Sequence, residues 1–143
     1  MKKFEFSLKK LQRYKQQILD REKGILAGLQ KTKQQLEQQI EELERFRAEK
    51  TQQLNDKQKK GMSSAELAGY RFFQDNIRHQ IAGLQQQLKE LQVQLDAQIE
   101  IVMKASQEMK SIDKLEEKQL EEYKLEVSRA QSEEISEFIT MKL

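Results

Sequence analysis

Apolar residues recur mostly at steps of three, four and seven along almost the whole 143-residue chain, and no proline interrupts them. This spacing is typical of the seam between paired helices, and a chain without proline lacks the residue that most strongly breaks a helix. Spacings of four at Leu91, Leu95 and Ile99 indicate a stutter in the repeat. The first series is Phe4, Leu8, Leu11, Ile18, Ile25, Leu29, Leu36, Ile40, Leu43 and Leu54. The second is Leu67, Tyr70, Phe73, Ile77, Ile81, Leu84, Leu88, Leu91, Leu95, Ile99, Val102, Met109, Ile112, Leu120, Tyr123, Val127, Ala130 and Phe138.

One interruption separates the two series. Residues 55–61 contain no apolar side chain and end on Gly61, which suits the left-handed backbone that often follows a helix. Ser63 and Glu66 have the spacing of a capping box, which marks the start of a helix. We therefore predict a helix over about residues 4–59, a turn at about 56–63, and a longer helix over about 63–140, all in one domain spanning 1–143.

The charges favour an antiparallel arrangement. Residues 1–33 hold ten Lys/Arg and three Asp/Glu, a net of +7, whereas residues 113–143 hold five and nine, a net of −4. A hairpin places these segments side by side. The predicted fold is therefore all-α, a long two-helix antiparallel coiled-coil hairpin. Pairing outward from the turn sets Phe4 opposite a residue near Glu117. The apolar stripe beyond Leu120 then has no partner helix in the chain, so we expect it to bind another protein.

Chemistry of other kinds is not expected. There is no cysteine, and His79 is the only histidine, so a zinc site is not predicted. Gly24 and Gly28 lie in a helical pattern, which is not a phosphate-binding loop. We predict no catalytic, cofactor or metal site, and no enzyme activity. The net charge of +2 does not favour nucleic acid, and no apolar run predicts membrane insertion, so a cytoplasmic location is expected.

Aromatic residues gather on both sides of the predicted turn. Phe72 and Phe73 are about 100° apart around a helix, so both cannot face a two-helix seam. With Phe46 and Tyr70, they either thicken the seam or provide an anchor for a partner protein. Near the N-terminus Phe4 and Phe6 are two residues apart, so one of this pair should also leave the seam.

Several short segments together resemble the FliJ family of flagellar type III protein export over nearly the whole chain. The likeness rests on Phe4-Glu5-Phe6-Ser7-Leu8 with Leu11 and Tyr14, on Gly61-Met62-Ser63 with Glu66, Tyr70 and Phe73, and on Lys114-Leu115-Glu116-Glu117-Lys118 with Tyr123, Glu133 and Glu134.

The resemblance implies a coiled coil similar to the gamma-subunit stalk of rotary ATPases. Its implied partners are a hexameric export ATPase, the cytoplasmic part of a membrane export-gate protein, and export chaperones, which would associate the chain with the cytoplasmic face of the membrane. Where family members have an aromatic residue one turn after Phe46, this chain has Lys50. The implied gate-binding residues are Gln39, Leu43, Phe46, Phe73 and Ile77. The implied ATPase-facing residues are Phe4, Phe6, Leu8, Leu11, Arg13, Tyr123, Val127 and Phe138.

One other function fits the pattern of apolar residues, and a second is disfavoured by the charges. A purely structural coiled-coil spacer, or a stalk in another secretion or rotary ATPase system, would have the same seam. A helix lying on a membrane surface needs a basic polar face, but the basic stretch from Lys2 to Lys15 is expected to lie against the acidic helix.

Overall fold

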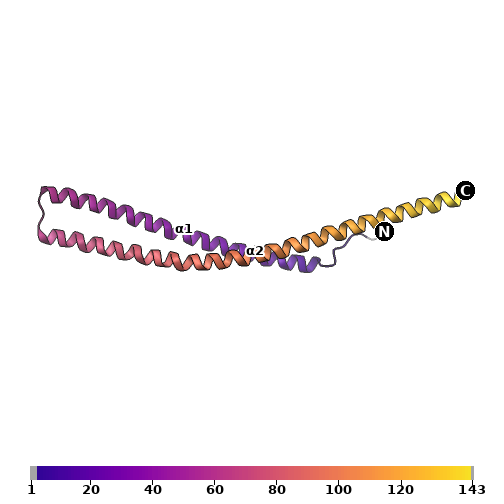
Figure 1. The fold of residues 1–143 in the computed structure, drawn as a ribbon, viewed down its shortest axis with the longest axis horizontal. Helices are drawn as coiled ribbons and strands as arrows, with labels where there is room; N and C mark the ends of the chain where they lie inside the picture. Colours follow the sequence, from indigo (N-terminus) through magenta and orange to yellow (C-terminus); the bar gives the residue numbers. More distant parts are fainter. Residues whose placement is uncertain (1–2, 143) are drawn as a thin grey trace. The chain divides into compact units, whose positions relative to one another are not determined.

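The computed structural model describes residues 3–142 of the chain. It contains two helices, α1 (Lys9–Lys60) and α2 (Ser64–Lys142), and no strand within those residues (Figure 1). The all-α helical hairpin expected from the sequence is confirmed. The backbone divides into two compact units. The turn unit is Gly24–Ile99, and the end unit combines Met1–Lys23 with Glu100–Leu143.

The connection between the helices, in the turn unit, is short because a single glycine reverses the chain. Gly61 has a φ of 99°, a conformation that costs other residues about 1–2 kcal/mol. Its N–H donates to the Gln58 carbonyl oxygen at 3.4 Å, and three lysines lie in the last turn of α1, where positive charge is favourable. The Ser63 hydroxyl oxygen accepts a hydrogen bond from the Glu66 N–H at 3.2 Å, which confirms the predicted cap of α2.

The seam of α2 in the turn unit follows an unbroken heptad instead of the predicted stutter. After Leu91 and Leu95 the next buried residue is Gln98, which is 7% exposed, whereas Ile99 is 39% exposed. The predicted stutter was wrong because the prediction placed Ile99 in the seam for its apolar side chain, whereas the heptad repeat places Gln98 there. A polar side chain therefore occupies a seam position, and an isoleucine lies beside it.

In α1 too, the heptad position of a residue determines its burial more than its polarity does. In the end unit Gln12 and Leu19, seven residues apart, are both buried, while Leu11 is 40% exposed. In the turn unit Leu26 is half-buried and Ile25 is exposed. The sequence prediction chose the less buried member of Leu11-Gln12, Ile18-Leu19 and Ile25-Leu26. In the last two pairs both members are apolar, so polarity could not distinguish them.

The first described residues of the end unit are not helical, although a helix was predicted from about residue 4. Residues 3–8 form an irregular segment, and α1 begins at Lys9, whose N–H donates to the Phe6 carbonyl oxygen at 3.2 Å. Phe6 is buried, and the Phe4 ring lies 5.5 Å from that of Tyr123. A non-helical residue advances the chain by up to about 3.3 Å, against 1.5 Å in a helix, so Phe4 lies farther along α2 than the predicted neighbour near Glu117.

Candidate protein-binding surfaces

Charged and polar contacts join the two strongly charged segments in the end unit. The Lys9 and Lys15 ammonium groups lie 3.5 Å from Glu116 and 2.8 Å from Glu108. Between them, the buried Gln12 amide nitrogen donates to Asp113 at 2.9 Å and to Glu116 at 3.4 Å. Residue numbers rise along α1 as those of their partners fall along α2, so these contacts fix an antiparallel register in this unit.

The ion pair between Lys15 and Glu108 stabilises the charged lysine. The hydrogen bond to Glu108, and then its negative charge, raise the pKa of Lys15 above the ordinary value of 10.5. The pair is partly exposed to solvent, so it influences alignment more than total stability.

Beyond Tyr123, α2 presents apolar side chains that no other described residue covers. Each residue from 131 to 142 is exposed, including Ile135, Phe138 and Ile139, which share one helix face because they are three and four residues apart. The Lys142 ammonium lies 4.7 Å from the centre of the Phe138 ring. We call residues 131–142 the bare segment.

The predicted ATPase-facing residues occupy different environments in the end unit. Phe6 is buried and therefore supports the fold instead of offering a contact. Four of the others are half-buried and three are exposed. The half-buried ones are Phe4, Leu8, Tyr123 and Val127, and the exposed ones are Leu11, Arg13 and Phe138.

A second surface lies beside the turn, in the turn unit, where aromatic rings from both helices meet. The Phe46 and Phe73 rings pack edge to face with centres 5.4 Å apart, and Phe46 is 42% exposed. The Lys50 ammonium lies 5.6 Å from the first ring centre and 5.7 Å from the second. Lys57 stands 5.5 Å from the Tyr70 ring in the same way. We call Phe46, Lys50, Tyr70 and Phe73 the turn cluster.

Two of the predicted gate-binding residues, Phe46 and Phe73, belong to the turn cluster, and a third, Ile77, is buried. Gln39, Leu43 and Phe46 line an open hollow together with Glu42 and Leu84. Ile77 is only 4% exposed, so it packs in the seam and is not available at the surface. Leu84, one heptad after Ile77, also lines this hollow and was missed in the prediction of this site.

The two neighbouring phenylalanines have distinct roles. Phe73 packs on Phe46, whereas Phe72 is 74% exposed. Phe72 is therefore the member of the pair that points away from the seam. The contribution of Lys50 could not be read from the sequence, because one must know the register across the seam to place its ammonium group over both rings.

The described part of the chain offers no sign of a chemical centre. Residues 3–142 contain no group of three or more His, Cys, Asp or Glu side chains that could hold a metal ion, and His79 is exposed. Neither α1 nor α2, within those residues, includes a stretch apolar and long enough to traverse a lipid bilayer.

Comparison with known proteins assigns the chain to a family. No curated protein and no solved structure matches it. The sequence model of a family described as "Flagellar FliJ protein" matches residues 4–142, which is nearly the whole chain. The chain therefore belongs to the FliJ family and is a flagellar, export-associated protein of a family whose members are non-catalytic.

Proposed function

We propose that this protein is the central stalk of a hexameric flagellar export ATPase, that it links the ATPase to the cytoplasmic part of the membrane export gate, and that it escorts export chaperones. It would act in the cytoplasm, at the cytoplasmic face of the membrane. The chaperone role rests on family membership alone, and no residue is assigned to it.

The observation that carries the proposal is the bare segment of α2. An isolated helix gains little stability from propensity alone, and most helices in proteins are stabilised by packing an apolar face. Residues 131–142 have such a face at Ile135, Phe138 and Ile139 and nothing in the described chain covers it. A spacer has no need of this face, whereas a stalk seated in a ring of subunits does.

The test of the ATPase contact replaces Ile135, Phe138 and Ile139 together by serine. Because hot-spot aromatic and aliphatic contacts dominate interfaces, we expect the affinity for the ATPase hexamer to fall by at least about tenfold. Val93→Ser, which changes an equally exposed apolar side chain in the turn unit, is the control and should bind like the unaltered protein. Native mass measurement should give one chain per hexamer.

Equal affinity of the triple variant and the control would contradict the stalk function. A ratio of six chains per hexamer would also contradict the stalk function, because each ATPase subunit would then bind one copy on the outside of the ring.

The turn cluster supports the link to the export gate. Phe46 is 42% exposed, against 74% for the outward-facing Phe72, and its ring packs on that of Phe73. Aromatic anchors are preferred in binding hot spots. We expect Phe46→Ala to weaken binding to the cytoplasmic gate fragment by about tenfold. A purely structural spacer gives a different result, since Phe46→Ala would then lower stability and leave the affinity for every partner unchanged.

A further inference from the structure

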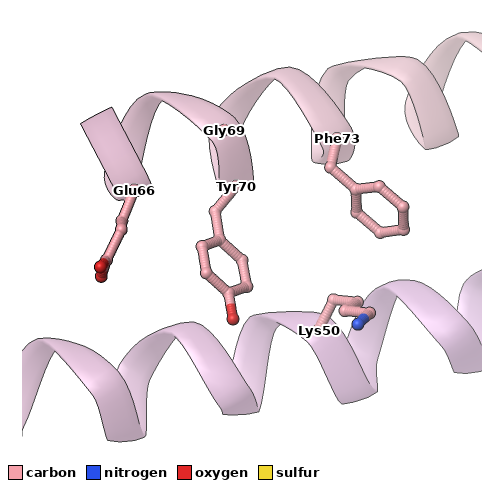
Figure 2. A pocket seen from close by; sticks show the side chains of 5 residues that line it. All are labelled: Lys50, Glu66, Gly69, Tyr70 and Phe73. Atoms are coloured by element: carbon pink, nitrogen blue, oxygen red, sulfur yellow. The ribbon is translucent and has the colours of Figure 1, made fainter. Parts of the chain in front are cut away.

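The turn unit contains a second hollow, on the side of the turn cluster nearer to the turn. It has a volume of about 260 Å³ and is lined by Lys50 of α1 and by Glu66, Gly69, Tyr70 and Phe73 of α2. Figure 2 shows the Tyr70 and Phe73 side chains directed from α2 toward α1, with Lys50 close to Phe73. This volume suits one large side chain and is smaller than the cavities that hold drug-sized ligands.

Gly69 keeps the floor of the hollow open. A Cβ atom placed at this position would meet no other atom within 4 Å, so the space above the helix backbone is empty. The residues on either side of this gap, Glu66 and Tyr70, belong to the same helix face as Phe73 because they are separated by three and four residues. An entering side chain would therefore contact two aromatic rings and a bare stretch of backbone.

The lysines beside this hollow form no ion pair with the described residues, although the Glu66 carboxylate also lines it. Among residues 3–142, neither Lys50 nor Lys57 forms an ion pair, and the contacts of both ammonium groups are with aromatic rings. From Lys50 to Arg71 the chain carries five Lys/Arg and two Asp/Glu, a net of +3. An ammonium group that lies over ring faces can still pair with a carboxylate.

We propose that this hollow binds an acidic segment of a partner protein, with an aromatic or aliphatic side chain of that segment entering over Gly69, between Tyr70 and Phe73, and a neighbouring carboxylate pairing with Lys50. The proposal rests on the proposed role of the turn cluster in partner binding and adds the chemistry that the partner must have. A phosphate surface is a poorer occupant, because it offers no aromatic or aliphatic side chain to enter between Tyr70 and Phe73. Glu66 lines the same hollow, so the carboxylate of the bound segment must lie on the side of Lys50. Lys50 is thus a specificity-determining residue of this chain.

The direct test selects short random displayed peptides on the full chain and counterselects them on a Lys50→Glu, Gly69→Leu double variant. The surviving peptides should be enriched in Asp or Glu next to an aromatic or aliphatic residue. A surviving pool without this enrichment would overturn the proposal, whatever the gate fragment does.

A second measurement uses the cytoplasmic gate fragment as the probe, in titration calorimetry at two salt concentrations. Lys50→Glu and Gly69→Leu should each weaken binding by at least about tenfold, and Lys50→Met should bind less tightly with a smaller salt dependence. Lys89→Glu, a charge reversal at an exposed lysine of the same unit, should change nothing. Circular dichroism of each variant verifies that the helices remain.

The outcomes separate this site from the gate function. If Phe46→Ala abolishes gate binding while Lys50→Glu and Gly69→Leu retain it, the gate link stands and this site is refuted. If the selected peptides bind as expected and the gate fragment does not bind the unaltered chain, the site stands and the gate link is refuted. Binding to phosphatidylglycerol vesicles that is lost in Lys50→Glu and kept in Gly69→Leu would also overturn the proposal, since it assigns Lys50 to a lipid surface.

Discussion

Gln12 is a buried amide in the seam of the end unit, and its hydrogen bonds are incomplete. Its nitrogen donates to Asp113 and Glu116, but its side-chain oxygen is buried without a hydrogen-bond partner. A buried polar atom that lacks a partner costs about 1–3 kcal/mol, whereas the two carboxylates can turn to water. We infer that this glutamine aligns the helices at the expense of stability.

Substitution of Gln12 by leucine should therefore raise the free energy of unfolding by about 1 kcal/mol. Gln12→Ala, which also removes the amide but leaves a gap, should lower it by about 1 kcal/mol. Urea denaturation followed by circular dichroism measures both values. A less stable leucine variant would mean that the bonds to Asp113 and Glu116 outweigh the unpaired oxygen.

Lys15 gives a pH dependence with a defined sign. Its pKa is raised in the folded protein, so the stabilisation from its pair with Glu108 is complete below the ordinary value of 10.5 and is lost as the pH rises through the raised pKa. The unaltered protein should thus melt slightly higher than Glu108→Gln at neutral pH, and the two melting temperatures should converge above that pKa. A difference that persists in strong base would contradict this origin of the shift.

At the scale of the helices, the turn was the most predictable part of the fold. Gly61 and Ser63 act through local backbone geometry, which neighbouring residues in the sequence determine almost completely. The seam was less predictable. Gln98 is buried and Ile99 is not, because once the heptad is set by many residues, a single polar side chain is carried into the seam with it.

The remaining errors have physical causes of the same kind. The irregular segment at residues 3–8 was predicted as helix because Phe4, Leu8 and Leu11 happen to fit helical spacing. Ile77 is buried as its place in the second apolar series predicts, and only the family resemblance assigned it to a binding surface. The position of Lys50 over two rings depends on which residues face each other across the seam. A strict count in sevens from Leu19 recovers Gln12, and one from Ile77 recovers Leu91 and Gln98, but no count reveals a cation held by rings from two helices.

Glycine substitutions test the geometry of the turn. Gly61→Ala should lower the free energy of unfolding by about 1–2 kcal/mol, since its Cβ would meet no neighbour and only the positive φ is unfavourable. Gly28→Ala, within α1, should raise it by about 0.5–1 kcal/mol because alanine is the better helix former and there is space for its methyl group. Chemical denaturation of the pair against the unaltered protein checks both signs, and equal effects would refute the assigned role of the backbone at Gly61.

At the scale of the whole molecule, the two chain ends should contribute very unequally to stability. Phe6 is buried, so Phe6→Ala should lower the free energy of unfolding by about 3 kcal/mol. Deletion of residues 131–142 removes only exposed side chains and should change it by less than about 0.5 kcal/mol. Thermal melts of the two variants make the comparison, and a large loss on deletion would show that the bare segment already has a partner within the protein.

The seam is thin throughout the described chain, where no large side chain falls below 2% exposure. Each heptad of a helix pair is stabilised mainly by contacts with the adjacent heptads, so local unfolding of one heptad removes few contacts from a distant one. Amide hydrogens should therefore exchange with solvent in a graded series from the helix ends inward, and not in one cooperative event. A protein built in this way can loosen locally, to admit a partner helix, while the rest of the pair stays closed.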